Sequence, residues 1–212
     1  MTLGMLLLAA AGQAGTPVLQ DYGPPRVGVL LQFEKPAAPG FLKPLEQEVG
    51  KTFRAAGIDV RWEVLSPQKR VGTYDRVIIA QMRGACGFPR VATVTEAPDL
   101  RARLGWTMVN EGDVIPHSVI DCEQIARVVA QWRRQGARHA TIPALYYRLA
   151  SRVLTHEMMH VLLKTPDHDH ADFTRSPLRS SDFDLVPKLN REQIAALMRA
   201  FRPTPPASLA RQ

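Results

Sequence analysis

Residues 156–170 read HEMMHVLLKTPDHDH, and this stretch holds four of the six histidines in the chain. On a helix, His156 and His160 are four residues apart and share one face, so two neutral imidazoles can bind the same zinc ion. Glu157 lies beside that position and can take a proton from a zinc-bound water. The stretch therefore predicts a hydrolytic zinc site on a helix.

The context of the motif favours this interpretation over chance. The motif belongs to a long apolar helical run that includes Ile142, Tyr146, Leu149, Val153, Val161 and Leu163. The alternative is a buried helix with two hydrogen-bonded core histidines and an exposed DHDH loop.

A zinc site of this kind needs a third protein ligand. His168 and His170 follow the motif directly, after the Thr165-Pro166 step that is expected to end the helix. Both histidines could face the same side of an extended segment. Carboxylates further along the chain are rival ligands, although zinc binds them less readily than a nearby imidazole. The rival carboxylates are Glu192, Asp182 and Asp184.

The segment resembles the metzincin clan of zinc peptidases, whose pattern is HExxHxxGxxH followed by a methionine-bearing turn. His156, Glu157 and His160 match that pattern. Leu163 stands at the family's glycine position, and Pro166 stands at the position of its third histidine. The resemblance implies zinc-dependent hydrolysis of peptide bonds in a peptide or protein substrate.

The departures from the family pattern give the spacing HExxH-x7-H, with His168 as the late third ligand and His170 as the alternative. We expect the helix to continue through Lys164, so that a longer segment returns to the metal. The pattern looks like that of small secreted bacterial metzincin-like proteins. No methionine lies between Met159 and Met198, and Leu178 in the segment 176–179 would replace the methionine of the turn.

The resemblance implies an α+β, zincin-like (metzincin-type) fold, in which a mixed sheet packs against helices. The HExxH helix is the active-site helix, and a small helical part follows it. Periodicity predicts strands and helices in a compatible order. The predicted strands are 27–33, 58–62, 76–82, 105–110 and 114–120, with a hairpin turn at 111–113. The predicted helices are 44–56, 123–134, the motif helix from Ile142, and 191–201.

In the family, the active-site cleft lies between the edge strand of the sheet and the HExxH helix. An extended substrate adds to that edge. The strand around Trp106-Thr107-Met108 is the candidate for this role.

Residues 16–202 are expected to form one zincin-like catalytic domain, followed by a disordered Pro-rich tail at 203–212. Residues 1–15 resemble a signal peptide, with a short apolar core and small residues up to Gly15, although no Lys or Arg precedes Arg26. The apolar core is too short to span a bilayer, and we expect no transmembrane span. The expected location is secreted or periplasmic.

Cys86 and Cys122 are the two cysteines, and they fit an exported protein with one disulfide; two buried thiols are the alternative. The net charge of +7 is spread along the chain and could favour an anionic envelope surface. Aromatic residues do not interleave with the basic ones, so nucleic-acid binding is not predicted.

The sequence therefore predicts a zinc-dependent peptidase. The alternative is a catalytically inactive, zinc-stabilised binding module of the same fold, which the missing glycine, the late third histidine and the missing methionine turn would fit. Glu157 favours the peptidase, because a structural zinc site has no need of a carboxylate at that position.

Overall fold

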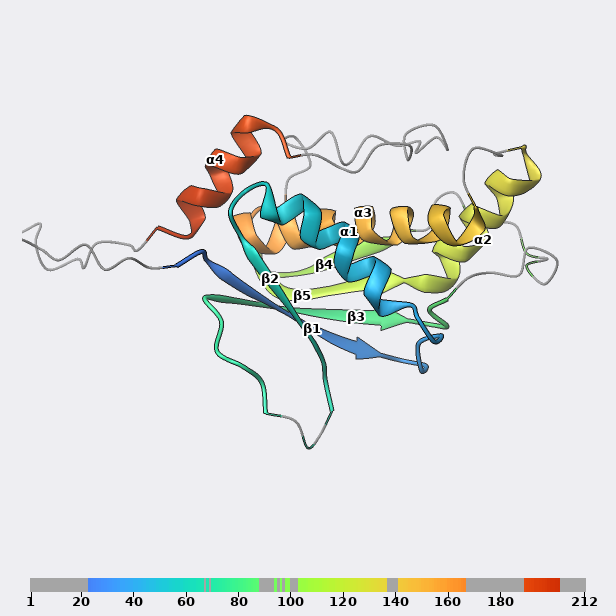
Figure 1. Ribbon diagram of the computed structural model, residues 1–212, viewed down its shortest axis with the longest axis horizontal. Helices are drawn as coiled ribbons and strands as arrows, with labels where there is room; N and C mark the ends of the chain where they lie inside the picture. The colour runs from blue at the N-terminus through green and yellow to red at the C-terminus, as the bar shows by residue number, and fades with distance from the viewer. Residues whose placement is uncertain are drawn as a thin grey trace, which may run out of the picture.

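The structure is a computed structural model, drawn in Figure 1. It describes residues 23–66, 68, 70–87, 94, 96, 98–99, 103–136, 141–166 and 189–202. The secondary structure elements follow in the order β1 (Arg26–Phe33), α1 (Leu42–Arg54), β2 (Asp59–Val64), β3 (Arg76–Arg83), β4 (Gly105–Asn110), β5 (Asp113–Asp121), α2 (Cys122–Arg134), α3 (Ile142–Leu163) and α4 (Arg191–Ala200).

The five strands form one sheet in the order β2-β1-β3-β5-β4. Strands β2, β1, β3 and β5 run parallel, and β4 runs antiparallel to β5. The prediction of a mixed sheet with packing helices is therefore confirmed. Among the described strands, β4 lies at one edge of the sheet, and it contains the Trp106-Thr107-Met108 segment that was expected at an edge.

A two-residue turn joins β4 to β5. Asn110 pairs with Asp113, and Glu111 and Gly112 between them have φ angles of 51° and 89°. Positive φ at both central positions is the geometry that suits the right-handed twist of a hairpin. The predicted hairpin is confirmed, with Asp113 belonging to the second strand rather than to the turn.

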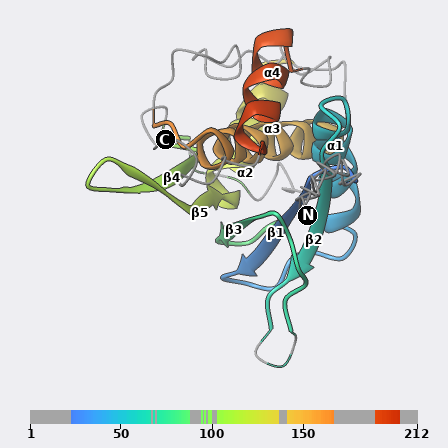
Figure 2. The ribbon, with the colours of Figure 1, turned by 90° about the vertical axis from the view of Figure 1, so that its left-hand side faces the viewer.

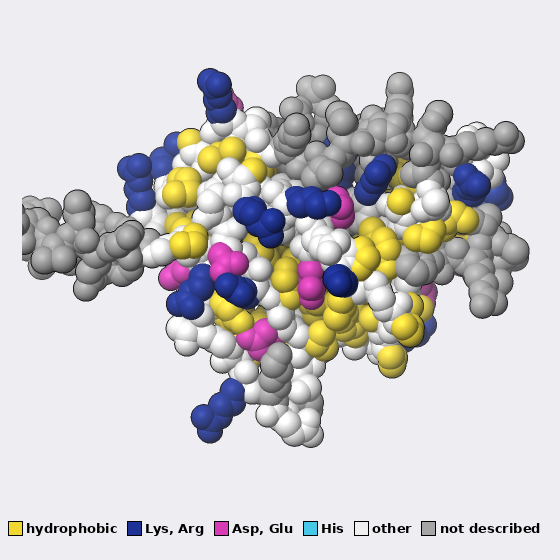
Figure 3. Space-filling view, in the orientation of Figure 1, with side chains coloured by type: hydrophobic (Ala, Val, Ile, Leu, Met, Phe, Trp, Pro, Cys, Tyr) yellow, Lys and Arg dark blue, Asp and Glu magenta, His cyan; other side chains and the backbone are white. Residues whose placement is uncertain are grey.

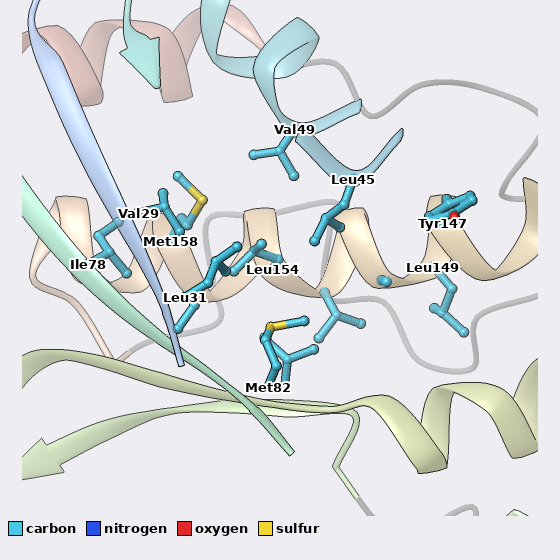
Figure 4. Close-up of a cluster of buried hydrophobic side chains, with 14 of the residues drawn as sticks. Val29, Leu31, Leu45, Val49, Ile78, Met82, Tyr147, Leu149, Leu154 and Met158 are labelled. Atoms are coloured by element: carbon cyan, nitrogen blue, oxygen red, sulfur yellow. The ribbon is translucent and has the colours of Figure 1, made fainter. Parts of the chain in front are cut away.

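Helices α1 and α3 lie side by side on one face of the sheet (Figures 1 and 2). The parallel register pairs Val29 with both Trp62 and Ile78, so alternate residues of three strands face these helices. Figure 4 shows the resulting core, in which side chains from β1 and β3 meet those of both helices. The labelled core residues are Val29, Leu31, Leu45, Val49, Ile78, Met82, Tyr147, Leu149, Leu154 and Met158.

Helix α1 occupies Leu42–Arg54, whereas 44–56 was predicted. In the sequence, the helical spacing of Leu45, Val49 and Phe53 predicts that these residues face inward. All three are fully buried, so the face of the helix was identified correctly. The end was placed two residues too late, because Ala56 and Gly57 form a tight turn instead. Their amides donate to the carbonyls of Phe53 and Arg54, and Gly57 has a φ of 71°.

The predicted disulfide is confirmed, because Cys86 and Cys122 are bonded to each other. Cys122 is the first residue of α2, and the carboxylate of Asp121 caps this helix by accepting from the amide of Gln124 at 2.8 Å. Both cysteines are buried. The bond therefore ties the segment after β3 to the start of α2.

Helix α4 begins with a capping box formed by Asn190 and Gln193. Leu197 of this helix is fully buried, and the Arg76 guanidinium at the start of β3 lies 5.7 Å from the ring centroid of Phe201. Arg76 also donates to the carbonyl of Ala200 at 3.2 Å. These contacts hold the end of α4 beside the start of β3.

On the face drawn in Figure 3, Lys and Arg side chains are spread over the surface, with Asp and Glu side chains among them. The net positive charge is therefore not concentrated in one patch on that face. Among the described residues, no helix has both the length and the apolar character that a membrane crossing requires.

Replacing both Cys86 and Cys122 by alanine should destabilise the protein. The bond closes a loop between residues 36 apart, and on the entropic model its loss costs roughly 3–4 kcal/mol. For a domain of this size, we expect the melting temperature to fall by about 8–15 °C in calorimetry. Reductant should lower the melting temperature of the wild type similarly and leave the double variant unchanged. An unchanged melting temperature in the variant would contradict the prediction.

Candidate metal centre

Helix α3 carries the HEMMH motif and is the most buried helix of the described structure. Thr141 caps its start by accepting from the amide of Ala144 at 3.3 Å, and Pro143 lies in the first turn, where a missing amide hydrogen costs nothing. The helix packs against α1, α2, α4 and the sheet. Most of its residues from Leu145 to Leu162 are therefore buried, and the polar ones among them face protein rather than bulk water.

His156 and His160 approach each other closely on this helix. Their Nε2 atoms are 2.9 Å apart, and the ring planes cross at 83°. His160 is 7% exposed, and the side chain of His156 is 15% exposed. The two ring nitrogens thus converge on one point, as the spacing of four residues along a helix predicts.

The carbonyl of Thr165 determines which nitrogen of His160 carries the hydrogen. It lies 2.7 Å from His160 Nδ1, and a carbonyl can only accept, so Nδ1 is the donor. In the neutral ring, the lone pair is then on Nε2, the atom that faces His156. A metal-binding imidazole usually donates from its other ring nitrogen to a carboxylate, a backbone carbonyl or a water, so His160 fits a zinc ligand.

The end of α3 differs from the sequence prediction. The helix was expected to continue through Lys164, but it ends at Leu163, and Lys164 has left-handed angles with φ 53° and ψ 41°. The amide of Thr165 bonds the carbonyl of His160 at 3.2 Å, and that of Lys164 bonds Val161 at 3.4 Å. These are the bonds of a Schellman motif, which takes the chain out of the helix. Leu163, which stands at the glycine position of the family pattern, is thus still helical, and the left-handed residue is Lys164.

Glu157 is 4% exposed and faces the edge strand. Its Oε2 atom accepts from Thr107 Oγ1 at 2.7 Å, while its Oε1 atom lies 4.0 Å from His156 Nε2. The carboxyl group therefore lies between β4 and the pair of imidazoles. A group in this place can exchange a proton with a molecule bound beside the histidines.

Gly105 explains how β4 approaches α3 so closely. A Cβ atom at this position would lie 2.6 Å from Val153 Cγ1 and 3.3 Å from Glu157 Cγ. Any side chain here would therefore push the strand away from the helix. Sequence patterns placed Thr107 in the candidate edge segment and Gly105 at the start of the same predicted strand, but assigned neither residue a contact with Glu157. The signal available was their place in the candidate edge strand, but which residues of that strand meet Glu157 depends on the sheet register.

Of the candidate third ligands, only Glu192 lies within the described residues. His168 and His170, together with Asp182, Asp184 and Leu178, fall in the stretch 167–188. Glu192 is described, in the exposed first turn of α4. Within the described ranges, no three His, Cys, Asp or Glu side chains gather as metal ligands would. The structure therefore does not bring Glu192 to the two histidines.

The two tyrosines that precede the motif belong to the core rather than to the site. Tyr146 donates to the carbonyl of Cys122 at 3.3 Å and accepts from the amide of Gly87 at 3.4 Å. Burial raises the pKa of its hydroxyl well above the ordinary value. Tyr147 donates to the carbonyl of Gly40 at 3.0 Å. Both hydroxyls are thus engaged away from the histidine pair.

No protein-family model matches this sequence, and no curated protein sequence matches it either. Among solved structures, the chain is similar to the archaemetzincin of Methanopyrus kandleri. The TM-score is 0.47 at 16% identity, and the match covers 86% of this chain and 98% of the other. A likeness at this level does not place the chain in a family.

Replacing Lys164 by glycine should stabilise the protein. A left-handed residue with a Cβ atom costs about 1 kcal/mol relative to glycine, and the Lys164 side chain is exposed. We expect calorimetry to show a melting temperature about 2–4 °C higher. Lys164→Ala is the matched control, because it also removes the charge but keeps the Cβ atom, and it should give no gain. A lower melting temperature for the glycine variant would argue against this account of the turn.

Proposed function

We propose that this protein is a zinc-dependent peptidase of zincin-like, metzincin-type fold, in which residues 16–202 form one catalytic domain. The observation that carries the proposal is the convergence of the His156 and His160 Nε2 atoms, with the Glu157 carboxyl group beside them and next to an edge strand. A histidine pair with only a structural role would not require a buried carboxyl group at that place.

His156 and His160 would hold the zinc ion, with His168 as the third ligand and His170 as the alternative. When bound, zinc supplies a Lewis acid that lowers the pKa of a water ligand and polarises a carbonyl oxygen. The hydrogen bond from His160 Nδ1 to Thr165 supports this role, since it leaves the lone pair of Nε2 directed at the shared point.

Glu157 would act as the general base and then as the general acid. It takes a proton from the water that attacks the carbonyl carbon of the scissile amide. When the bond between carbon and nitrogen breaks, it passes that proton to the leaving amine, so that one acid and one amine are released. Its burial supports the role, because a carboxyl group shielded from bulk water keeps the transferred proton within the site.

The substrate would be an extended segment of a peptide or protein that adds to β4. Two observations support this. Strand β4 is at the edge of the sheet among the described strands, and its residue Thr107 touches Glu157. A chain paired with β4 would therefore run past the base and the histidine pair.

We further propose that the protein acts outside the cytoplasm, after removal of residues 1–15. The Cys86–Cys122 disulfide supports this location, because such bonds persist in oxidising compartments. The net charge of +7 would favour association with anionic envelope surfaces there.

Purified protein should contain about one equivalent of zinc by metal analysis. His156→Ala, His160→Ala and His168→Ala should each lose most of it. His117→Ala is the matched control. His117 lies on β5 opposite Ile79, and the buried neighbours of Ile79, Ile78 and Ala80, face the helices. Ile79 and His117 therefore lie on the other face of the sheet, away from the histidine pair. The His117→Ala variant should keep the metal.

If His170→Ala rather than His168→Ala loses zinc, the third ligand is His170. A zinc content well under half an equivalent in the reconstituted wild type would refute the site.

Glu157→Gln should keep the zinc and lose activity. The amide cannot accept the proton, so cleavage of a diverse peptide library should fall by at least about 10²-fold. Mass spectrometry of the products measures this, with wild type and variant matched for zinc content and melting temperature. Wild-type rates in the variant would exclude the role of Glu157. If the folded, zinc-loaded wild type cleaves no more than the variant, the protein is instead a zinc-stabilised binding module.

Intact-mass analysis of exported protein tests the proposed location. We expect a chain that begins at Gly15 or Thr16 and gains two hydrogens on reduction, as opening the Cys86–Cys122 bond requires. Recovery of a chain that still begins at Met1, with two thiols that react with an alkylating agent, would contradict the proposal.

A further inference from the structure

The side chains of Ser118, Thr107 and Glu157 form a series of hydrogen bonds that links the sheet to α3. Thr107 of β4 and Ser118 of β5 are directly opposite in the antiparallel ladder, and their hydroxyl oxygens are 2.9 Å apart. Thr107 Oγ1 is also 2.7 Å from Glu157 Oε2 and 3.2 Å from the backbone carbonyl of Glu157. Ser118 is fully buried, and Glu157 is 4% exposed.

The number of hydrogens determines the direction of these bonds. A hydroxyl group has one hydrogen to donate, and the carboxylate required of a general base can only accept. Thr107 therefore donates to Glu157, and its shortest contact on that side is with Oε2. Because the Thr107 hydrogen is used there, Ser118 must donate to Thr107. The order is thus Ser118 to Thr107 to Glu157.

This order distinguishes the two carboxyl oxygens. Oε2 is held on the side of the edge strand by Thr107, and Oε1 is on the side of the histidines, 4.0 Å from His156 Nε2. A carboxyl group that could rotate about its last bond would exchange these oxygens and change the direction of its lone pairs. A hydrogen bond to one oxygen restricts that rotation.

We propose that Thr107, supported by Ser118, is a positioning residue that orients Glu157 so that Oε1 faces the reacting centre. This inference rests on the peptidase activity proposed above. Thr107 does not touch the reacting atoms and acts through Glu157 alone.

Two features of β4 support a specific role for the contact between Thr107 and Glu157. The register of β4 and β5 is regular from Gly105 to Thr107 and shifts between Thr107 and Val109. Interruptions of a ladder such as β-bulges are frequent next to active sites, where they direct a side chain. The missing side chain at Gly105 allows the strand to lie against α3, which brings the short Thr107 side chain within reach of Glu157. A larger residue at position 105 would move Thr107 away.

The first experiment measures kinetics on zinc-loaded protein. Thr107→Val keeps the shape of the side chain and removes the hydroxyl, so we expect kcat to fall at least about tenfold, with KM and zinc content unchanged. Thr107→Ser keeps a hydroxyl and should restore most of the rate. Ser118→Ala should have a smaller effect in the same direction. Thr52→Val removes a buried hydroxyl on α1 and serves as the matched control, with wild-type kcat expected.

The second experiment requires neither activity nor metal. Urea unfolding of the metal-free protein is measured for wild type, Thr107→Val, Glu157→Ala and the double variant. If Thr107 donates to Glu157, Thr107→Val lowers the urea midpoint by about 0.5 M in the wild type, and by much less when Glu157 is alanine. Equal shifts in the two backgrounds would overturn the inference.

The two experiments separate this inference from the proposed function. Coupled unfolding together with a loss of kcat that Thr107→Ser rescues supports it. Coupled unfolding with wild-type kcat in Thr107→Val overturns it, because the orientation of Glu157 would then not matter for the reaction. If no variant and no wild-type protein cleaves peptides, the peptidase proposal and the catalytic purpose of the contact fail together, and the unfolding cycle still decides whether Thr107 holds Glu157.

Discussion

The contact between β4 and α3 is the constraint on which the candidate site depends. Gly105 allows the strand to lie against Val153 and Glu157, and Thr107 then bonds Glu157 through its side chain. The strand can take this place because it runs antiparallel at the edge of an otherwise parallel sheet. One face of the helix thus carries the histidine pair, and the neighbouring strand holds the carboxyl group beside it.

The burial of α3 constrains the same site from the other side. The helix packs against the sheet and the three other helices, so His160 and Glu157 cannot move far without disturbing the core. At its end, the left-handed turn at Lys164 brings the carbonyl of Thr165 onto His160. The same turn therefore ends the helix and orients one of the two imidazoles. Packing density in protein interiors is high enough to keep such an arrangement in one geometry.

Much of the fold could be predicted from local patterns. Runs or alternation of apolar residues, together with turn residues, predicted each of the five strands, and the spacing of Leu45, Val49 and Phe53 identified the buried face of α1. Errors were confined to element ends, such as the last turn of α1 and the exit from α3. An end depends on which backbone bonds close the last turn, and apolar periodicity carries no information on that choice.

The pairing of Cys86 with Cys122 was expected because the chain has two cysteines, and the structure confirms it. The proximity of His156 and His160 could also be predicted from the local sequence, since a helix of 3.6 residues per turn places residues four apart on one face. The roles proposed for these histidines and for Glu157 remain predictions. A candidate site whose residues lie within one helix can be proposed from the sequence alone.

The sequence by itself determined the order of strands and helices, the buried faces of the helices and the proximity of His156, Glu157 and His160. Only the tertiary structure decided that Thr107, which is bonded to Ser118, meets Glu157, and that Gly105 is the residue that allows it. The bond between Thr107 and Glu157 joins residues 50 positions apart. These contacts depend on the strand register and on the distance between sheet and helix, which the packing of the whole core determines. No local pattern in the chain encodes that distance.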